Sequence, residues 1–196
     1  MIPASVRLLG RALLEDDFQA VRALIRREMA LWRGARTLEL GCGPGLFADV
    51  FAHGDYVGVD ADARDIDRAR RTRPGVFVVG DARRGLELPD ARFDQLLIHG
   101  LIDRLPDAEA RAVLGEMIRV LAPGGMALVI EPVLPSRHHC GARLIARLTG
   151  GMGRRSADAY RRLYRASAPI SREEVTRIGL LVVFAAVLNP RKTRAS

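Results

Sequence analysis

Apolar positions along the chain follow two patterns. In the longer stretches they recur every three or four residues, which predicts amphipathic helices. Elsewhere they form short continuous runs, which are typical of strands buried in a parallel sheet between layers of helices. The predicted helices cover residues 16–32, 61–71 and 108–121, with another from the glycine-rich turn at 41–45 to about residue 51. The predicted strands cover residues 37–40, 56–60, 76–79, 93–99 and 126–131.

The pattern changes after Pro132. Residues 135–168 are rich in Arg, Gly and His, and we interpret them as a helical cap inserted over the carboxyl edge of the sheet. A capping box formed by Ser171 and Glu174 predicts a short helix that ends at Gly179. Residues 180–188 are the last apolar run and predict the last strand. Without an internal repeat or a linker, residues 1–196 are expected to form a single α/β domain.

Composition is that of a water-soluble globular protein. Of the 196 residues, 48% are hydrophobic and 28% are charged. No apolar run is long enough to span a membrane and the start lacks the features of a secretion signal, so we expect a cytoplasmic protein. The net charge of +8 is carried almost entirely by arginine, which favours a solvated basic surface over a nucleic-acid site. Cys42 and Cys140 are expected to be free thiols.

A glycine-rich turn directly follows the first predicted strand. Glycines at 41, 43 and 45 let the backbone turn tightly and approach a ligand closely. A turn of this kind suits a dinucleotide as well as other cofactors, and it can also bind nothing. A dehydrogenase would place its third glycine two residues later, at the position of Phe47.

Two carboxylates end the next strands. Asp60 follows the second strand, where it could bind both hydroxyls of a ribose or cap the next helix. Asp81 follows the third strand and could accept a hydrogen bond from an exocyclic amine. Because ligands of open α/β sheets bind at the carboxyl ends of the strands, we expect these groups to converge with the glycine turn.

Five segments together resemble the ordered motifs of class I S-adenosylmethionine-dependent methyltransferases. They are LELGCGPG at 38–45, VGVD at 57–60, GDA at 80–82, FDQLLI at 93–98 and RVLAPGG at 119–125. The resemblance covers residues 35–131 and implies a Rossmann-like three-layer sandwich that binds S-adenosylmethionine. That family ends with a sixth strand and an antiparallel seventh. Only one apolar run follows Pro132 here, so strand seven is in question.

The resemblance also implies a cofactor-binding set. It comprises Glu39, Gly41, Cys42, Gly43, Gly45, Asp60, Ala61, Asp81, Ala82 and His99. The turn at 41–45 would lie under the methionine part of the cofactor, with Glu39 orienting its ammonium. Asp60 would bind the ribose and Asp81, with the Ala82 backbone, the adenine. Ala61 or Asp62 would border the adenine face.

Methyl transfer needs alignment and exclusion of water more than acid–base groups. His99 is the candidate base by position, with a structural role as the alternative; Asp103, Glu131, His138 and His139 are also near the expected mouth. His138, His139 and Cys140 are consecutive and lack the usual spacing of metal ligands, so no metal is expected.

The acceptor is expected to be a small organic or lipid-like molecule, in the quinone-biosynthesis-like branch of the family. No Asn/Asp-Pro-Pro-Tyr-like tetrapeptide follows the fourth strand, which argues against methylation of exocyclic amines in bases or glutamine. Tyr160 and Tyr164 could line an acceptor pocket or pack within the cap. The alternatives are an RNA or protein methyltransferase, an aminopropyl transferase, and a non-catalytic cofactor-binding protein of the same fold. The oligomeric state stays open.

Overall fold

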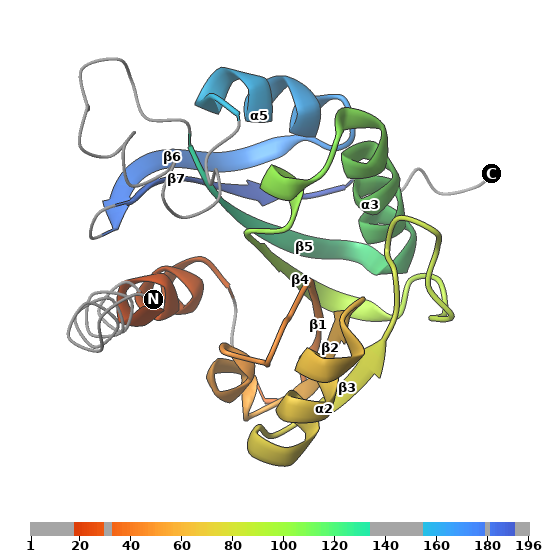
Figure 1. Cartoon of the computed structure of the whole chain (residues 1–196). Coiled ribbons are helices and arrows are strands. Elements are labelled where there is room, and N and C mark those ends of the chain that lie inside the picture. The colour runs from red at the N-terminus through yellow and green to blue at the C-terminus, as the bar shows by residue number, and fades with distance from the viewer. Residues whose placement is uncertain (1–17, 30–32, 134–154, 179–180, 191–196) are drawn as a thin grey trace, which may run out of the picture.

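The computed structural model describes residues 18–29, 33–133, 155–178 and 181–190. Within these residues, seven strands form one sheet in the order β3-β2-β1-β4-β5-β7-β6 (Figure 1). The strands are β1 (Arg36–Leu40), β2 (Asp55–Asp60), β3 (Val76–Val79), β4 (Phe93–His99), β5 (Leu121–Pro132), β6 (Ile170–Ile178) and β7 (Leu181–Leu188). The first five pair in parallel, as the apolar runs predict.

Helices cover both faces of the sheet. They are residues 18–28 (hereafter the N-terminal helix), α2 (Ala63–Thr72), α3 (Asp107–Val120) and α5 (Ala157–Arg165). One core contains buried residues of α3 and α5, and a second core contains those of the N-terminal helix and α2. Figure 1 shows α3 and α5 on one side of the sheet and the N-terminal helix on the other. The predicted three-layer α/β sandwich is therefore confirmed.

The helix predicted directly after the glycine turn is reduced to one 3-10 turn, η1 (Ala48–Phe51). Gly41, Gly43 and Gly45 all have positive φ angles, which a right-handed helix does not allow. A helix can therefore begin only after Gly45. The segment directly after β1 is consequently a loop and not the start of a long helix.

The short helix predicted from Ser171 is wrong, because this segment is strand β6. Its capping-box serine instead donates its hydroxyl to the Val187 carbonyl of β7, at 3.2 Å. The whole segment pairs antiparallel with β7, so the backbone groups that face β7 form the hydrogen bonds of a strand ladder. Most of its side chains are exposed or half-buried, which hid the strand among polar residues.

Strand seven is present. The last apolar run is β7, which lies between β5 and β6 and runs antiparallel to both. The described part of the predicted cap segment includes α5, which contacts α3, β6 and β7. The remainder of that segment falls within residues 134–154, which lie outside the described residues. In the part of the chain that is described, no helix is long and apolar enough to cross a membrane.

Three stacked rings fasten α5 to the sheet. Tyr160 and Tyr164 are fully buried, and their ring centroids lie 5.8 and 6.0 Å from that of Phe184 in β7. These tyrosines are core residues in the structure. An aromatic cluster of this size removes a large apolar area from water and locks the helix in place.

We expect Phe184→Ala to lower the free energy of unfolding by ~3–5 kcal/mol, because it leaves a cavity between α5 and β7. Denaturant unfolding followed by circular dichroism measures this. Val76→Ala, in β3 at the opposite edge of the sheet (59% exposed), is the control and should change stability by less than ~0.5 kcal/mol. Equal effects of the two substitutions would contradict the role of the ring stack.

Candidate functional site

The Asp60 carboxylate links the ends of β1 and β2. One oxygen accepts the N–H of Gly43 at 2.8 Å, and the other accepts the N–H of Asp62 at 2.8 Å. The turn is also held by the N–H groups of Gly41 and Cys42, which both donate to the Val59 carbonyl. Asp62, not Asp60, is the N-cap of α2. The carboxylate of Asp60 therefore fixes the glycine turn against the neighbouring strand.

Glycine is required in this turn for space as well as for backbone conformation. Gly45 has a φ of 72°, and a Cβ there would lie 2.8 Å from the Phe77 ring. Gly41 has a φ of 74°, and a Cβ there would lie 3.1 Å from the Leu101 side chain. Any larger residue would push the turn away from the sheet.

A hollow lies over the ends of β1, β2 and β3. It is lined by Leu40, Gly41, Val59, Asp60, Ala61, Gly80, Asp81, Ala82, Arg83, Leu101, Leu105 and Val113. The structure thus brings together five of the residues predicted to bind the cofactor: Gly41, Asp60, Ala61, Asp81 and Ala82. Glu39, Cys42, Gly43, Gly45 and His99 are not among the described residues that line this hollow.

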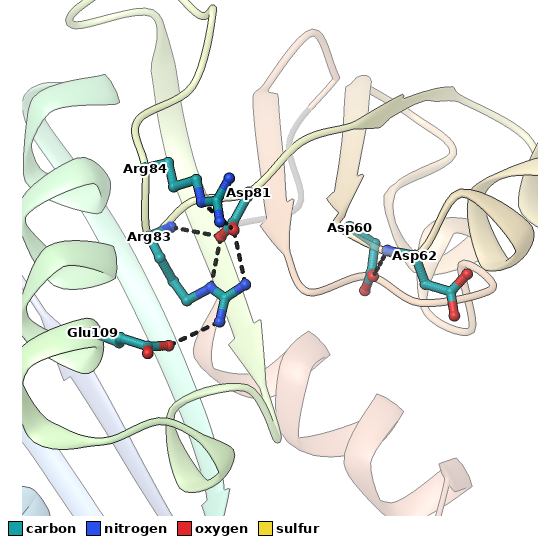
Figure 2. A network of polar contacts seen from close by, with 6 residues as sticks. All are labelled: Asp60, Asp62, Asp81, Arg83, Arg84 and Glu109. Carbon is teal, nitrogen blue, oxygen red and sulfur yellow. Dashed lines mark hydrogen bonds and ion pairs between the residues drawn. The ribbon is translucent and has the colours of Figure 1, made fainter.

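Asp81 is held by an arginine fork. Arg83 donates through Nε to Oδ1 and through Nη2 to Oδ2, each at 2.8 Å, and its Nη1 donates to Glu109 of α3 at 2.9 Å. Figure 2 shows Arg83 between the two carboxylates, with Asp60 on the other side of the view. The hydrogen bonds from Arg83 lower the pKa of Asp81 below its usual range. The sequence prediction missed Arg83 and Glu109.

Glu39 lies beneath the turn rather than in the hollow. Its side chain is buried and accepts a hydrogen bond from the Tyr56 hydroxyl of β2. Burial raises the pKa of Glu39 to about 8. Cys42 is a free, buried thiol, as expected, and burial raises its pKa well above the usual range. It is accordingly a poor nucleophile.

His99 lies at the end of β4, with its ring centroid 5.0 Å from that of Phe47 in an edge-on contact. Burial, with a smaller contribution from the charge of Arg104, lowers the pKa of His99 to about 4. The imidazole is therefore neutral at physiological pH and a weak base.

A second buried carboxyl group supports the loop after β4. Glu131 of β5 accepts the N–H groups of Ile102 and Asp103 at 2.9 and 3.1 Å, and burial raises its pKa to about 8. The Tyr160 hydroxyl lies 3.2 Å from Asp103 Oδ1. Because these contacts hold the segment that carries Leu101 and Leu105, the buried acids shape the wall of the hollow.

Within the described residues, no group of three potential ligands could hold a metal ion. His138, His139 and Cys140, which the sequence analysis considered, lie outside those residues.

Residues 37–125 match the family model described as "Methyltransferase domain". An uncharacterized methyltransferase from Mycobacterium sp. (strain JLS) is 29% identical over 92% of this chain and 76% of its own length. The chain belongs to the class I S-adenosylmethionine-dependent methyltransferases. The cofactor of this methyltransferase is accordingly S-adenosylmethionine.

Other comparisons with this methyltransferase are more partial. A phosphatidylethanolamine N-methyltransferase from Cereibacter sphaeroides is 32% identical over 61% of this chain and 63% of its own. A demethylmenaquinone methyltransferase from Beutenbergia cavernae is 40% identical over 50% of this chain and 41% of its own. The PH0226 protein from Pyrococcus horikoshii OT3 shares the fold, with a TM-score of 0.74, 23% identity and coverage of 93% and 91% of the two chains.

The buried Glu39 predicts a pH dependence of stability in the methyltransferase. Since the pKa of Glu39 is raised to about 8 in the folded state, the folded chain retains a proton that the unfolded chain has lost between the ordinary pKa of 4.5 and 8. Stability therefore falls as pH rises through this range, by up to about 1.4 kcal/mol per pH unit for one proton. Glu39→Gln keeps an acceptor for Tyr56 but removes this contribution.

Denaturant unfolding at pH 5, 6, 7 and 8 measures the slope, which we expect to be shallower for Glu39→Gln. Glu87→Gln, at an exposed carboxylate, should retain the wild-type slope. Identical slopes for the wild type and Glu39→Gln would show that Glu39 does not carry the retained proton.

Proposed function

We propose that the methyltransferase binds S-adenosylmethionine in the hollow and transfers its methyl group to a small organic or lipid-like acceptor. The observation that carries this proposal is the convergence of the glycine turn, Asp60 and Asp81 at the carboxyl ends of three adjacent strands. Ligands of open α/β sheets bind at this edge, next to the point where the strand order reverses. Here that point lies between β1 and β4.

The free acceptor positions of Asp60 fit a ribose. Each of its oxygens accepts one backbone N–H and has a second lone pair available. Two lone pairs on one carboxylate match the two adjacent hydroxyls of a ribose. Ala61 would lie against the adenine face, and Asp81 with the Ala82 backbone would bind the adenine edge.

Most of the remaining predicted cofactor residues are in the glycine turn or directly beneath it. Gly41 and Gly43 would present their backbone to the methionine part, while Cys42 and Gly45 fill space beneath it. Glu39 would support the turn from below through Tyr56, rather than contact the ammonium.

The bound cofactor supplies an electrophilic methyl group on a sulfonium. The chain's contribution is alignment of the acceptor with that methyl group and exclusion of water, and alignment alone can supply ~7–11 kcal/mol of the barrier. His99 is neutral and packs against Phe47, so we assign it a structural role at the site rather than that of a strong base.

The character of the walls supports an apolar acceptor. Leu101, Leu105 and Val113 give the hollow apolar walls. The relatives named for phosphatidylethanolamine and demethylmenaquinone support acceptors of lipid or quinone type. The presence of β7 removes the argument from a missing strand that favoured a non-catalytic protein.

We expect Asp60→Ala to weaken binding of S-adenosylhomocysteine by about 100-fold or more, because two hydrogen bonds to a charged group are lost. Isothermal titration calorimetry measures this. Asp62→Ala is the matched control: it removes the N-cap of α2 and lowers stability by ~0.5–2 kcal/mol, but the residue does not line the hollow. No binding by folded wild-type protein would refute the proposed cofactor site.

The acceptor class is tested by incubating the protein and methyl-labelled S-adenosylmethionine with cell extract. We expect label in the small-molecule or lipid fraction, and none with Asp60→Ala. Label in RNA or protein would replace the proposed acceptor with the corresponding polymer. Cofactor binding without transfer to any fraction would favour the non-catalytic alternative.

A further inference from the structure

Arg83 is the one basic side chain among the residues that line the described hollow. It lies where β3 ends and touches Asp81 with three donors: its backbone N–H and Nε reach Oδ1 at 3.0 and 2.8 Å, and Nη2 reaches Oδ2 at 2.8 Å. A planar fork of this kind fixes both the position and the rotation of a carboxylate.

The fork leaves one acceptor position open on the Asp81 carboxylate. Each carboxylate oxygen can accept about two hydrogen bonds. Oδ1 of Asp81 already accepts two, both from Arg83, whereas Oδ2 accepts one. Arg84 approaches Oδ2 only to 3.5 Å, as an ion pair. The carboxylate is thus left with one well-defined acceptor direction, on Oδ2.

Glu109 holds Arg83 from the opposite side. It lies in the first turn of α3 and accepts Arg83 Nη1 at 2.9 Å, so a continuous chain of contacts runs from α3 through Arg83 to Asp81 (Figure 2). Because α3 is packed into the core, it gives the exposed Asp81 loop a rigid reference.

We propose that Arg83, held by Glu109, is a positioning residue that makes Asp81 selective for the adenine amino group of the cofactor. This inference rests on the proposed function. An exocyclic amine at C6 of the base donates to the open lone pair of Oδ2. A carbonyl at the same position, as in hypoxanthine, has no donor and places its own lone pairs against an ionised carboxylate.

The discriminating measurement is the ratio of two dissociation constants, for S-adenosylhomocysteine and for its deaminated analogue S-inosylhomocysteine, determined by calorimetry. The wild type should bind the adenine ligand more tightly. Arg83→Ala should weaken that binding and reduce the preference about ten-fold, the effect of losing one well-oriented charged hydrogen bond. Arg83→Lys should reduce it similarly, because lysine retains the charge but not the fork.

Arg84→Ala is the matched control. It removes the same charge from the neighbouring residue, whose side chain is 85% exposed, and should leave the preference as in the wild type. Glu109→Ala should reduce the preference in the same direction as Arg83→Ala, because Arg83 is released. Thermal unfolding of each variant checks that the fold is retained.

An unchanged preference in both Arg83 variants would overturn the inference while leaving the proposed function intact. Tighter binding of S-adenosylhomocysteine by Arg83→Ala would also overturn it, since Arg83 would then be blocking Asp81. Equal binding of the two ligands by the wild type would likewise overturn the inference and leave the proposed function intact. Failure of the wild type to bind either ligand would instead refute the proposed cofactor site.

Discussion

The carboxylate of Asp60, which accepts one N–H from the β1 turn and one from the loop after β2, is the contact around which the site is organised. Neither loop has a regular structure that could fix its own conformation. The first contains three glycines with positive φ, and the second consists of the two residues between β2 and α2. The acid ties both to the rigid sheet. Stability and ligand geometry are therefore coupled at this residue, which is why a binding experiment on it needs a folding control.

The half of the fold that contains the glycine turn was predictable because its central strands are buried on both faces. A strand such as β4, with a nearly continuous apolar run, is visible in the sequence because a strand covered on both faces carries few polar residues. The convergence of Gly41, Asp60 and Asp81 was predictable for the same reason. Parallel strands place their carboxyl ends at one edge, so residues far apart in sequence meet there.

The features that local patterns did not predict have a common physical origin, which is that they depend on long-range contacts. Ser171 and Glu174 have the spacing of a helix cap, but the segment pairs along its length with β7 and forms strand β6. The buried carboxyl group of Glu39 accepts the hydroxyl of Tyr56, a contact between two strands that the motif around Glu39 does not predict. Arg83 and Glu109 are 26 residues apart and carry no motif, so only the folded chain brings them together.

The position of β7 has a consequence for how the protein is made. Among the described strands β7 is the last in sequence, but it lies inside the sheet, between β5 and β6. During synthesis, the edge of β5 that pairs with β7 stays without its partner until the β6–β7 hairpin is made, more than 30 residues later. An open apolar edge of this kind recruits other strands readily. The nascent chain is thus most exposed to misassociation in the interval between the synthesis of β5 and that of β7, when β1 to β4 have already been made.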